Sequence, residues 1–289
     1  MASIVESRIK TDEEYEDVSY YCLLIIDSVI EIMEYPFKSL EVTAKYRRSA
    51  GVGITDLAHS LASKGLNYSN GKKEMHNIAE RHSYYLHKAS LKLAKELGVC
   101  SGMEVSKYKD GWLPIDTYNK NVDGVVSGLK YDWEALRKDM VLVGGLRNSV
   151  LEAFMPNESS SILTNTTNSL YPIRQAKIAK SSGTNRNLFI APESEVLDYQ
   201  FAWDVPPKDL IDMYAIFQKF CGQAISADLY IDLRTVKEVS SRRLLQDFLY
   251  MTKMGVKTRY YVNSATGSSK EIEEETVEDV GCAGGGCTL

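Results

Sequence analysis

Apolar residues recur every three or four positions in several stretches of the chain, the spacing that places them on one face of an α-helix. The first helix is predicted over residues 12–33, ending before Pro36. A shorter helix is predicted over 56–63, and the clearest over 75–97, with Gly98 as its C-terminal cap. The expected buried face of the first helix consists of Val18, Cys22, Ile25, Ile26, Val29 and Met33.

The second half of the chain alternates short apolar runs, typical of buried strands, with helical patterns. Strands are predicted at residues 148–155, 224–231 and 256–262. Helices are predicted from about residue 157, over 208–221 and over 241–254. This alternation favours a mainly parallel α/β core, either barrel-like or doubly wound.

Residues 264–289 lack any such pattern. They contain almost no large apolar side chain, and the stretch 270–279 is dominated by acids. Such a segment buries too little surface to offset the entropy lost on ordering. Residues 1–263 are therefore expected to form the folded domain and residues 264–289 a flexible tail.

Composition narrows the function classes. The chain carries 34 Lys and Arg against 39 Asp and Glu, a net charge of −5. This balance argues against a sequence-independent nucleic-acid-binding protein, which needs cations to displace counterions from phosphate. No apolar run approaches the roughly 18 residues of a membrane span, and the first residues lack a secretory signal. The expected location is the cytoplasm, or the host cytoplasm if the chain is viral.

The tail ends with a pair of cysteines, Cys282 and Cys287, separated by Ala and three Gly. Glycine adopts the turn conformations that closure of a disulfide requires, so a redox pair is one interpretation. A metal clip or two idle thiols are the alternatives, but a metal site needs more ligands than lie nearby. As a flexible coil the 18 residues from Ser264 to Gly281 span about 23 Å, enough to carry a dithiol into an active site.

Two further features carry candidate chemistry. Tyr260 and Tyr261 are neighbours, and on a regular strand their rings would point to opposite faces, so stacking requires the chain to bend. The segment 155–161, Met-Pro-Asn-Glu-Ser-Ser-Ser, enters a predicted helix directly after a predicted strand. The N–H groups of a helix start and the serine hydroxyls favour an anion. A simple N-cap by Asn157 or Ser159 is the alternative, and Glu158 opposes an anion unless its carboxylate turns away.

Together these segments resemble the C-terminal part of the large, catalytic subunit of class I ribonucleotide reductase. The resemblance covers essentially the whole chain. It rests on Gly145-Leu-Arg-Asn-Ser149, Met155-Pro-Asn-Glu-Ser-Ser160, Gly255-Val-Lys-Thr-Arg-Tyr-Tyr261 and the terminal cysteines. Further similar stretches are Arg47-Arg48 before Gly51-Val-Gly-Ile-Thr55, Leu113-Pro-Ile-Asp-Thr-Tyr118 and Tyr131-Asp-Trp-Glu-Ala-Leu-Arg137.

The resemblance implies a fold and a set of roles. The fold would be the second half of a ten-stranded α/β barrel, with a helical N-terminal region and a disordered C-terminal tail. Tyr260 and Tyr261 would relay a radical, and Cys282 and Cys287 would reduce the active-site disulfide and be reduced in turn by thioredoxin or glutaredoxin. The substrate, a ribonucleoside diphosphate, would be held by Pro156, Asn157, Glu158, Ser159 and Ser160. The chain would bind no cofactor or metal itself, but would depend on a tyrosyl radical and dimetal centre in a separate small subunit.

The chain also departs from that family. It is less than half the expected length, and it lacks the Asn-x-Cys-x-Glu arrangement that holds the radical cysteine. The sequence therefore predicts the C-terminal piece of a split subunit, which completes its barrel with a separate N-terminal fragment. The alternatives are an inactive remnant or regulator that binds the small subunit, and a free-standing dithiol carrier that uses only the tail.

Overall fold

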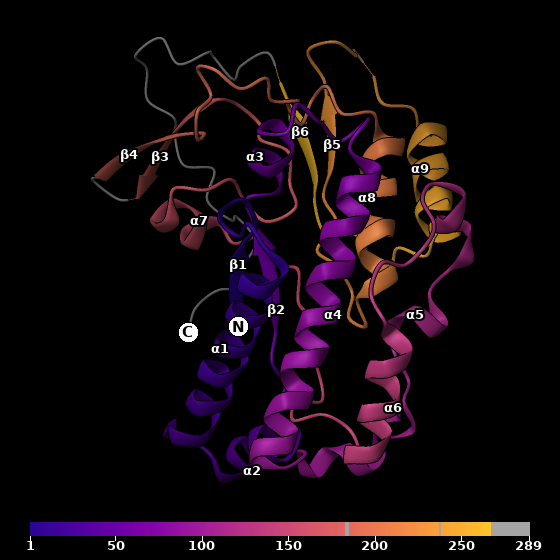
Figure 1. Cartoon of the computed structure of the whole chain (residues 1–289). Helices are drawn as coiled ribbons and strands as arrows, with labels where there is room; N and C mark the ends of the chain where they lie inside the picture. The colour runs from indigo at the N-terminus through magenta and orange to yellow at the C-terminus, as the bar shows by residue number, and fades with distance from the viewer. Residues whose placement is uncertain (183–184, 237, 267–289) are drawn as a thin grey trace.

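The computed structural model describes residues 1–182, 185–236 and 238–266, and shows short strands wrapped by longer helices (Figure 1). The strands are β1 (Ala2–Val5), β2 (Val52–Thr55), β3 (Lys177–Ser182), β4 (Asn185–Ile190), β5 (Leu229–Asp232) and β6 (Val262–Ala265). The α-helices are α1 (Asp12–Ile32), α2 (Lys38–Arg47), α3 (Leu57–Ala62), α4 (Lys72–Leu97), α5 (Pro114–Thr117), α6 (Trp133–Val143), α7 (Glu158–Thr164), α8 (Pro207–Phe220) and α9 (Ser241–Met254). Within these ranges, short 3-10 helices span Glu6–Arg8, Ser101–Val105, Lys107–Asp110 and Lys120–Gly124.

The inner layer is a row of five extended segments. β1 pairs in parallel with β2. β2 is bridged in parallel to the segment 150–154, where the Val52 N–H donates to Leu151 O over 2.9 Å. This segment reaches β5 through the bond from Ser226 N–H to Phe154 O, and β5 pairs in parallel with β6. Among the described residues β1 and β6 do not pair with each other. The five segments therefore form an open row, called the strand wall below, and not a closed barrel.

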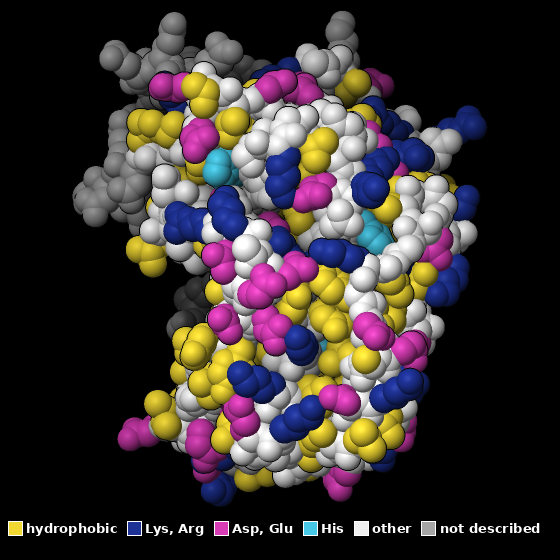
Figure 2. All heavy atoms as spheres, viewed as in Figure 1, with side chains coloured by type: hydrophobic (Ala, Val, Ile, Leu, Met, Phe, Trp, Pro, Cys, Tyr) yellow, Lys and Arg dark blue, Asp and Glu magenta, His cyan; other side chains and the backbone are white. Residues whose placement is uncertain are grey.

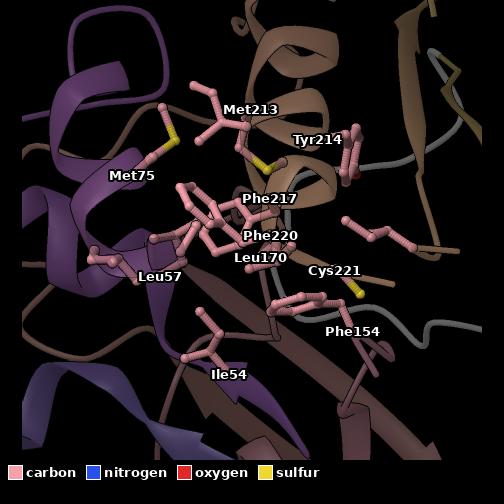
Figure 3. Close-up of a cluster of buried hydrophobic side chains, with 14 of the residues drawn as sticks. Ile54, Leu57, Met75, Phe154, Leu170, Met213, Tyr214, Phe217, Phe220 and Cys221 are labelled. Atoms are coloured by element: carbon pink, nitrogen blue, oxygen red, sulfur yellow. The ribbon is translucent and has the colours of Figure 1, made fainter. Parts of the chain in front are cut away.

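Four helices cover one side of this wall in the same order as the strands. α1 packs against α4, α4 against α8, and α8 against α9. A cluster of buried hydrophobic side chains lies where α4 and α8 meet the strands, as Figure 3 shows for Met75, Phe217 and Phe154. The rings of Phe154 and Phe217 meet edge-on, with centroids 5.3 Å apart. The core thus ties the segment 150–154, from which α7 begins, to the two central helices.

The helices predicted from periodicity are confirmed, most of them to within one residue. α9 has the predicted bounds, and α4 begins three residues earlier than expected. α1 begins after Thr11, whose side chain and that of Glu14 form a capping box with each other's backbone amides. The mixed α/β class is likewise confirmed, whereas α2, α6 and the antiparallel β3–β4 hairpin were not predicted.

The predicted buried face of α1 is confirmed only at Cys22 and Ile26, which are partly buried against the core. The fully buried residues are Tyr15, Ser19, Leu23 and Asp27. Val18, Ile25, Val29 and Met33 are exposed. The helix carries apolar residues on two faces, and periodicity alone does not reveal which face meets the core.

All three strand predictions also need correction, and β5 covers only the last part of the run predicted over 224–231. Residues 148–155 form a single bridge at Glu152 rather than a regular strand. β6 begins at Val262, so residues 256–261 lie outside it. The predicted flexible tail lies, beyond Thr266, outside the described residues.

Candidate functional site

The rings of Tyr260 and Tyr261 lie side by side, with centroids 4.0 Å apart and planes tilted by 48°. Both side chains are about half exposed. Gly255, in the left-handed conformation, ends α9, and the chain then runs irregularly to the pair. Because the pair precedes β6, the two rings are not forced to opposite faces. The bend that stacking requires is therefore present.

A buried carboxylate, Asp228, holds the backbone of this pair. Its Oδ1 accepts the N–H of Tyr261 over 3.1 Å, and its Oδ2 accepts the Asn263 side-chain amide over 2.9 Å. The chain on either side is also fixed, since Tyr260 N–H donates to Ala227 O and Leu229 N–H donates to Tyr261 O. The Asp228 carboxylate thus accepts the Tyr261 N–H, which in a regular strand would donate to a backbone carbonyl of the neighbouring strand. Burial raises the pKa of Asp228, while its bonds with Asn263 and Tyr261 oppose that rise.

Two buried tyrosines, Tyr171 and Tyr214, lie beside Asp228, and the Tyr214 hydroxyl accepts the Asp228 N–H over 3.0 Å. Tyr171 donates from its hydroxyl to Ser226 O over 2.6 Å. Burial raises the pKa of Tyr171, and the charges of Asp228, Tyr260 and Glu158 add to the rise. Tyr171 therefore lies within electrostatic range of both the tyrosine pair and the first residue of α7. The sequence carried a signal for this cluster, because Asp228 stands between apolar residues of a predicted strand.

The segment predicted to bind an anion turns from the strand wall into α7. Asn157 adopts the left-handed conformation, with φ of 58°, and its side-chain amide donates to Ile54 O over 3.3 Å. Pro156 is partly buried, whereas Glu158, Ser159 and Ser160 are exposed. The Ser160 hydroxyl donates to Asn157 O. The side chain of Asn157 thus braces the turn against β2 rather than capping α7, and the first turn of α7 faces outward.

A second buried carboxylate, Asp56, anchors the chain that follows α7. Its Oδ1 accepts the backbone N–H of Thr167 over 2.7 Å and the Thr167 hydroxyl over 3.2 Å. Its Oδ2 lies 3.0 Å from His59 Nδ1 and also accepts the hydroxyl of Ser7. These bonds lower the pKa of Asp56 against the effect of burial, and Asp56 raises that of His59. Sequence reasoning missed this anchor, which joins residues 111 positions apart.

The cysteines separate into two groups. Cys22, Cys100 and Cys221 are partly or fully buried. Burial raises the pKa of each, to about 11 for Cys22, so these thiols stay protonated and are poor nucleophiles. Cys282 and Cys287 lie outside the described residues. The predicted dithiol therefore has no structural description here.

A cavity of about 380 Å³ lies beside the C-terminal ends of α8 and α9. Trp112, Tyr118, Lys219 and Lys257 are among its lining residues, and none of the predicted site residues within the described ranges lines it. Lys219 Nζ lies 3.1 Å from an Asp123 carboxylate oxygen, so its charge is compensated. This cavity is therefore separate from the candidate site.

In the part of the chain that the structure describes, no three His, Cys, Asp or Glu side chains are grouped so as to hold a metal ion. None of the helices in these ranges combines the length and apolar character needed to cross a membrane.

A row of parallel strands with helices on one side, and polar residues at the strand ends, defines an incomplete α/β barrel. The family model of the ribonucleotide reductase barrel domain matches residues 1–198 and 187–262. The chain belongs to this family, and within it to the class I large, or alpha, subunits.

The relatives agree with this assignment. The chain is 39% identical over 272 residues to the ribonucleoside-diphosphate reductase subunit alpha of Haemophilus influenzae, covering 91% of this chain and 35% of the relative. It is 37% identical over 270 residues to the reductase 1 subunit alpha of Escherichia coli, covering 90% of this chain and 35% of the relative. The ribonucleoside-diphosphate reductase subunit alpha of Enterobacteria phage T4 is 36% identical over 268 residues, covering 89% of this chain and 35% of the relative. The chain thus spans about a third of the length of these relatives.

Proposed function

We propose that this chain is the C-terminal piece of a divided large subunit of an aerobic ribonucleoside-diphosphate reductase. It forms the second half of a ten-stranded barrel in which ribonucleoside diphosphates are reduced to deoxyribonucleoside diphosphates. The family membership and the open row of five extended segments support this proposal. The observation that carries it is the contact between the Tyr260 and Tyr261 rings, with centroids 4.0 Å apart.

In this proposal Tyr260 and Tyr261 relay an oxidising equivalent. A phenoxyl radical on one ring takes one electron and one proton from the neighbouring phenol, so the radical moves and the first phenol is restored. The exchange leaves no net charge in the protein interior, where charge is costly. Asp228 acts as a positioning residue, because it fixes the backbone of Tyr261 without touching a reacting atom.

The substrate diphosphate is proposed to bind at the turn 156–160. The N–H groups at the start of α7 and the hydroxyls of Ser159 and Ser160 are suitable donors for phosphate oxygens. The Glu158 side chain is exposed, which leaves it free to turn away from the anion. Asn157 braces this turn against β2.

The remaining roles belong to the tail and to the partners. Cys282 and Cys287 give two electrons and two protons to the active-site disulfide and become a disulfide themselves, which thioredoxin or glutaredoxin then reduces. The other partners are the N-terminal large-subunit fragment and the small subunit, whose dimetal centre supplies the tyrosyl radical. The chain works in the cytoplasm of the cell or of the viral host.

Substitution of the tyrosine pair tests this proposal. The chain is combined with the N-terminal fragment, the small subunit and a dithiol reductant, and deoxyribonucleotide formation is measured. Tyr260→Phe and Tyr261→Phe are each expected to abolish turnover, because phenylalanine lacks the proton and the accessible oxidation of a phenol. Sedimentation is expected to show unchanged assembly.

Tyr46→Phe is the matched control. It removes an exposed tyrosine hydroxyl that donates to Glu104, and turnover is expected to stay normal. Normal turnover in both variants of the pair would refute the relay. Binding of the chain to the small subunit, with no turnover even for the unaltered chain, would favour a regulator or inactive remnant.

A further inference from the structure

Helix α1 carries an exposed apolar stripe. It consists of Val18, Tyr21, Ile25, Val29 and Ile32, which are 39%, 59%, 63%, 48% and 78% exposed. Their spacing of three and four residues places them along one flank of the helix over most of its length. Figure 2 shows hydrophobic side chains gathered over the region of α1, at the left edge of the molecule. A continuous patch of this kind marks an interaction surface more often than a solvated one.

The opposite flank of α1 already has its partner within the chain. Glu16 forms an ion pair with Lys88 of α4, and Tyr20 donates from its hydroxyl to Glu96 of α4 over 2.7 Å. The buried residues, from Tyr15 to Asp27, lie between these two flanks. α1 therefore contacts α4 with one flank and leaves its apolar flank exposed.

The position of α1 in the fold indicates which neighbouring element its apolar flank would face. α1 follows β1, which pairs with β2 and, among the described residues, has no strand on its other side. The outer helices run in the order α1, α4, α8 and α9, so α1 is the first helix of the layer. The flank away from α4 thus points to the place where the preceding helix of a closed barrel would lie.

We propose that the apolar stripe of α1 is the docking surface for a helix of the part of the large subunit that this chain lacks. The inference rests on the proposed function and names the surface at which the two parts join. The occupant is argued from length, since about two thirds of each relative lies outside the matched region. A second copy of this chain would cover the stripe but leave β1 without a neighbouring strand.

Two substitutions test this surface by binding. The chain is titrated against the remainder of the large subunit, expressed as a separate polypeptide, and the dissociation constant is measured by sedimentation. Ile25→Glu combined with Val29→Glu is expected to weaken binding at least a hundredfold, because two charges would be buried without partners. Leu142→Glu, at an exposed apolar residue of α6, is the matched control and is expected to change the dissociation constant less than twofold. Equal binding by the double variant and the control would overturn the inference.

A photo-crosslink identifies the occupant. Ile25→p-benzoylphenylalanine is irradiated in the assembled reductase, and the linked peptides are identified by mass spectrometry. Links to a helical segment of the remainder of the large subunit support the inference, whereas links to the small subunit or to a second copy overturn it. Deoxyribonucleotide formation is measured on the same sample. Turnover with links elsewhere refutes the docking surface alone, and correct links without turnover refute the proposed function alone.

Discussion

Asp228→Asn is the substitution that probes the tyrosine clamp most sharply. The two carboxylate oxygens of Asp228 accept from the Tyr261 backbone and from the Asn263 side chain. An amide at position 228 has a single acceptor oxygen. Whichever way it turns, its NH2 group faces one of these two donors, so one of the two hydrogen bonds to position 228 is lost.

The cost follows from the burial of the site. Leaving a buried donor or acceptor unsatisfied costs about 1–3 kcal/mol. We therefore expect Asp228→Asn to lower the free energy of unfolding by about 2 kcal/mol. Urea unfolding followed by circular dichroism measures this change, with an unchanged slope as the sign that the folded state is intact.

Two matched variants isolate the cause. Asp228→Asn combined with Asn263→Asp restores one donor and one acceptor between the two side chains, and Arg174 can still donate to position 263. This double variant is expected to recover at least half of the lost stability. Asp17→Asn, at an exposed aspartate of α1, is expected to leave the urea midpoint unchanged. If Asp228→Asn unfolds at the same urea concentration as the unaltered chain, the clamp has no energetic role.

Three other predictions concern stability. Burial raises the pKa of Glu152 from 4.5 to about 7, so its folded form favours the proton and stability falls as the pH rises from about 4.5 through 7. Glu152→Gln is expected to remove this dependence on pH. In urea titrations at pH 8 its free energy of unfolding is expected to exceed that of the unaltered chain by about 3 kcal/mol, and parallel pH profiles of the two proteins would contradict this. Asp56→Ala is expected to cost about 2 kcal/mol and to speed hydrogen exchange at the Thr167 amide, and unchanged exchange would contradict the anchor. Leu23→Ala is expected to lower the free energy of unfolding by about 3 kcal/mol, whereas Ile25→Ala leaves it nearly unchanged; the reverse order in thermal melts would contradict the orientation of α1.

Helical periodicity predicted most of the longer helices because their buried faces recur over many turns. α4 is the clearest example, with buried residues from Met75 to Ala94. α1 was located correctly, but its predicted buried face shares only Cys22 and Ile26 with the observed one, since apolar residues on both faces satisfy the same spacing. Its true orientation is set by contacts with α4, which are distant in sequence.

The candidate site was predictable only in part. Tyr260 and Tyr261 were identified as a pair, but their bend depends on Asp228, which lies more than 30 residues earlier in the chain. Within the run predicted as a strand over 256–262, a carboxylate replaces a carbonyl as the partner of the Tyr261 N–H, and β6 begins only at Val262. The anchor of Asp56 on Thr167 is likewise a long-range contact that no local pattern indicates.

The most direct test of the central claim is formation of a deoxyribonucleoside diphosphate from a ribonucleoside diphosphate by purified components. The chain, the remainder of the large subunit and the small subunit are combined with a dithiol reductant, and each is omitted in turn. We predict product only when all three proteins are present. Product formed without this chain, or no product from the complete mixture, would contradict the account.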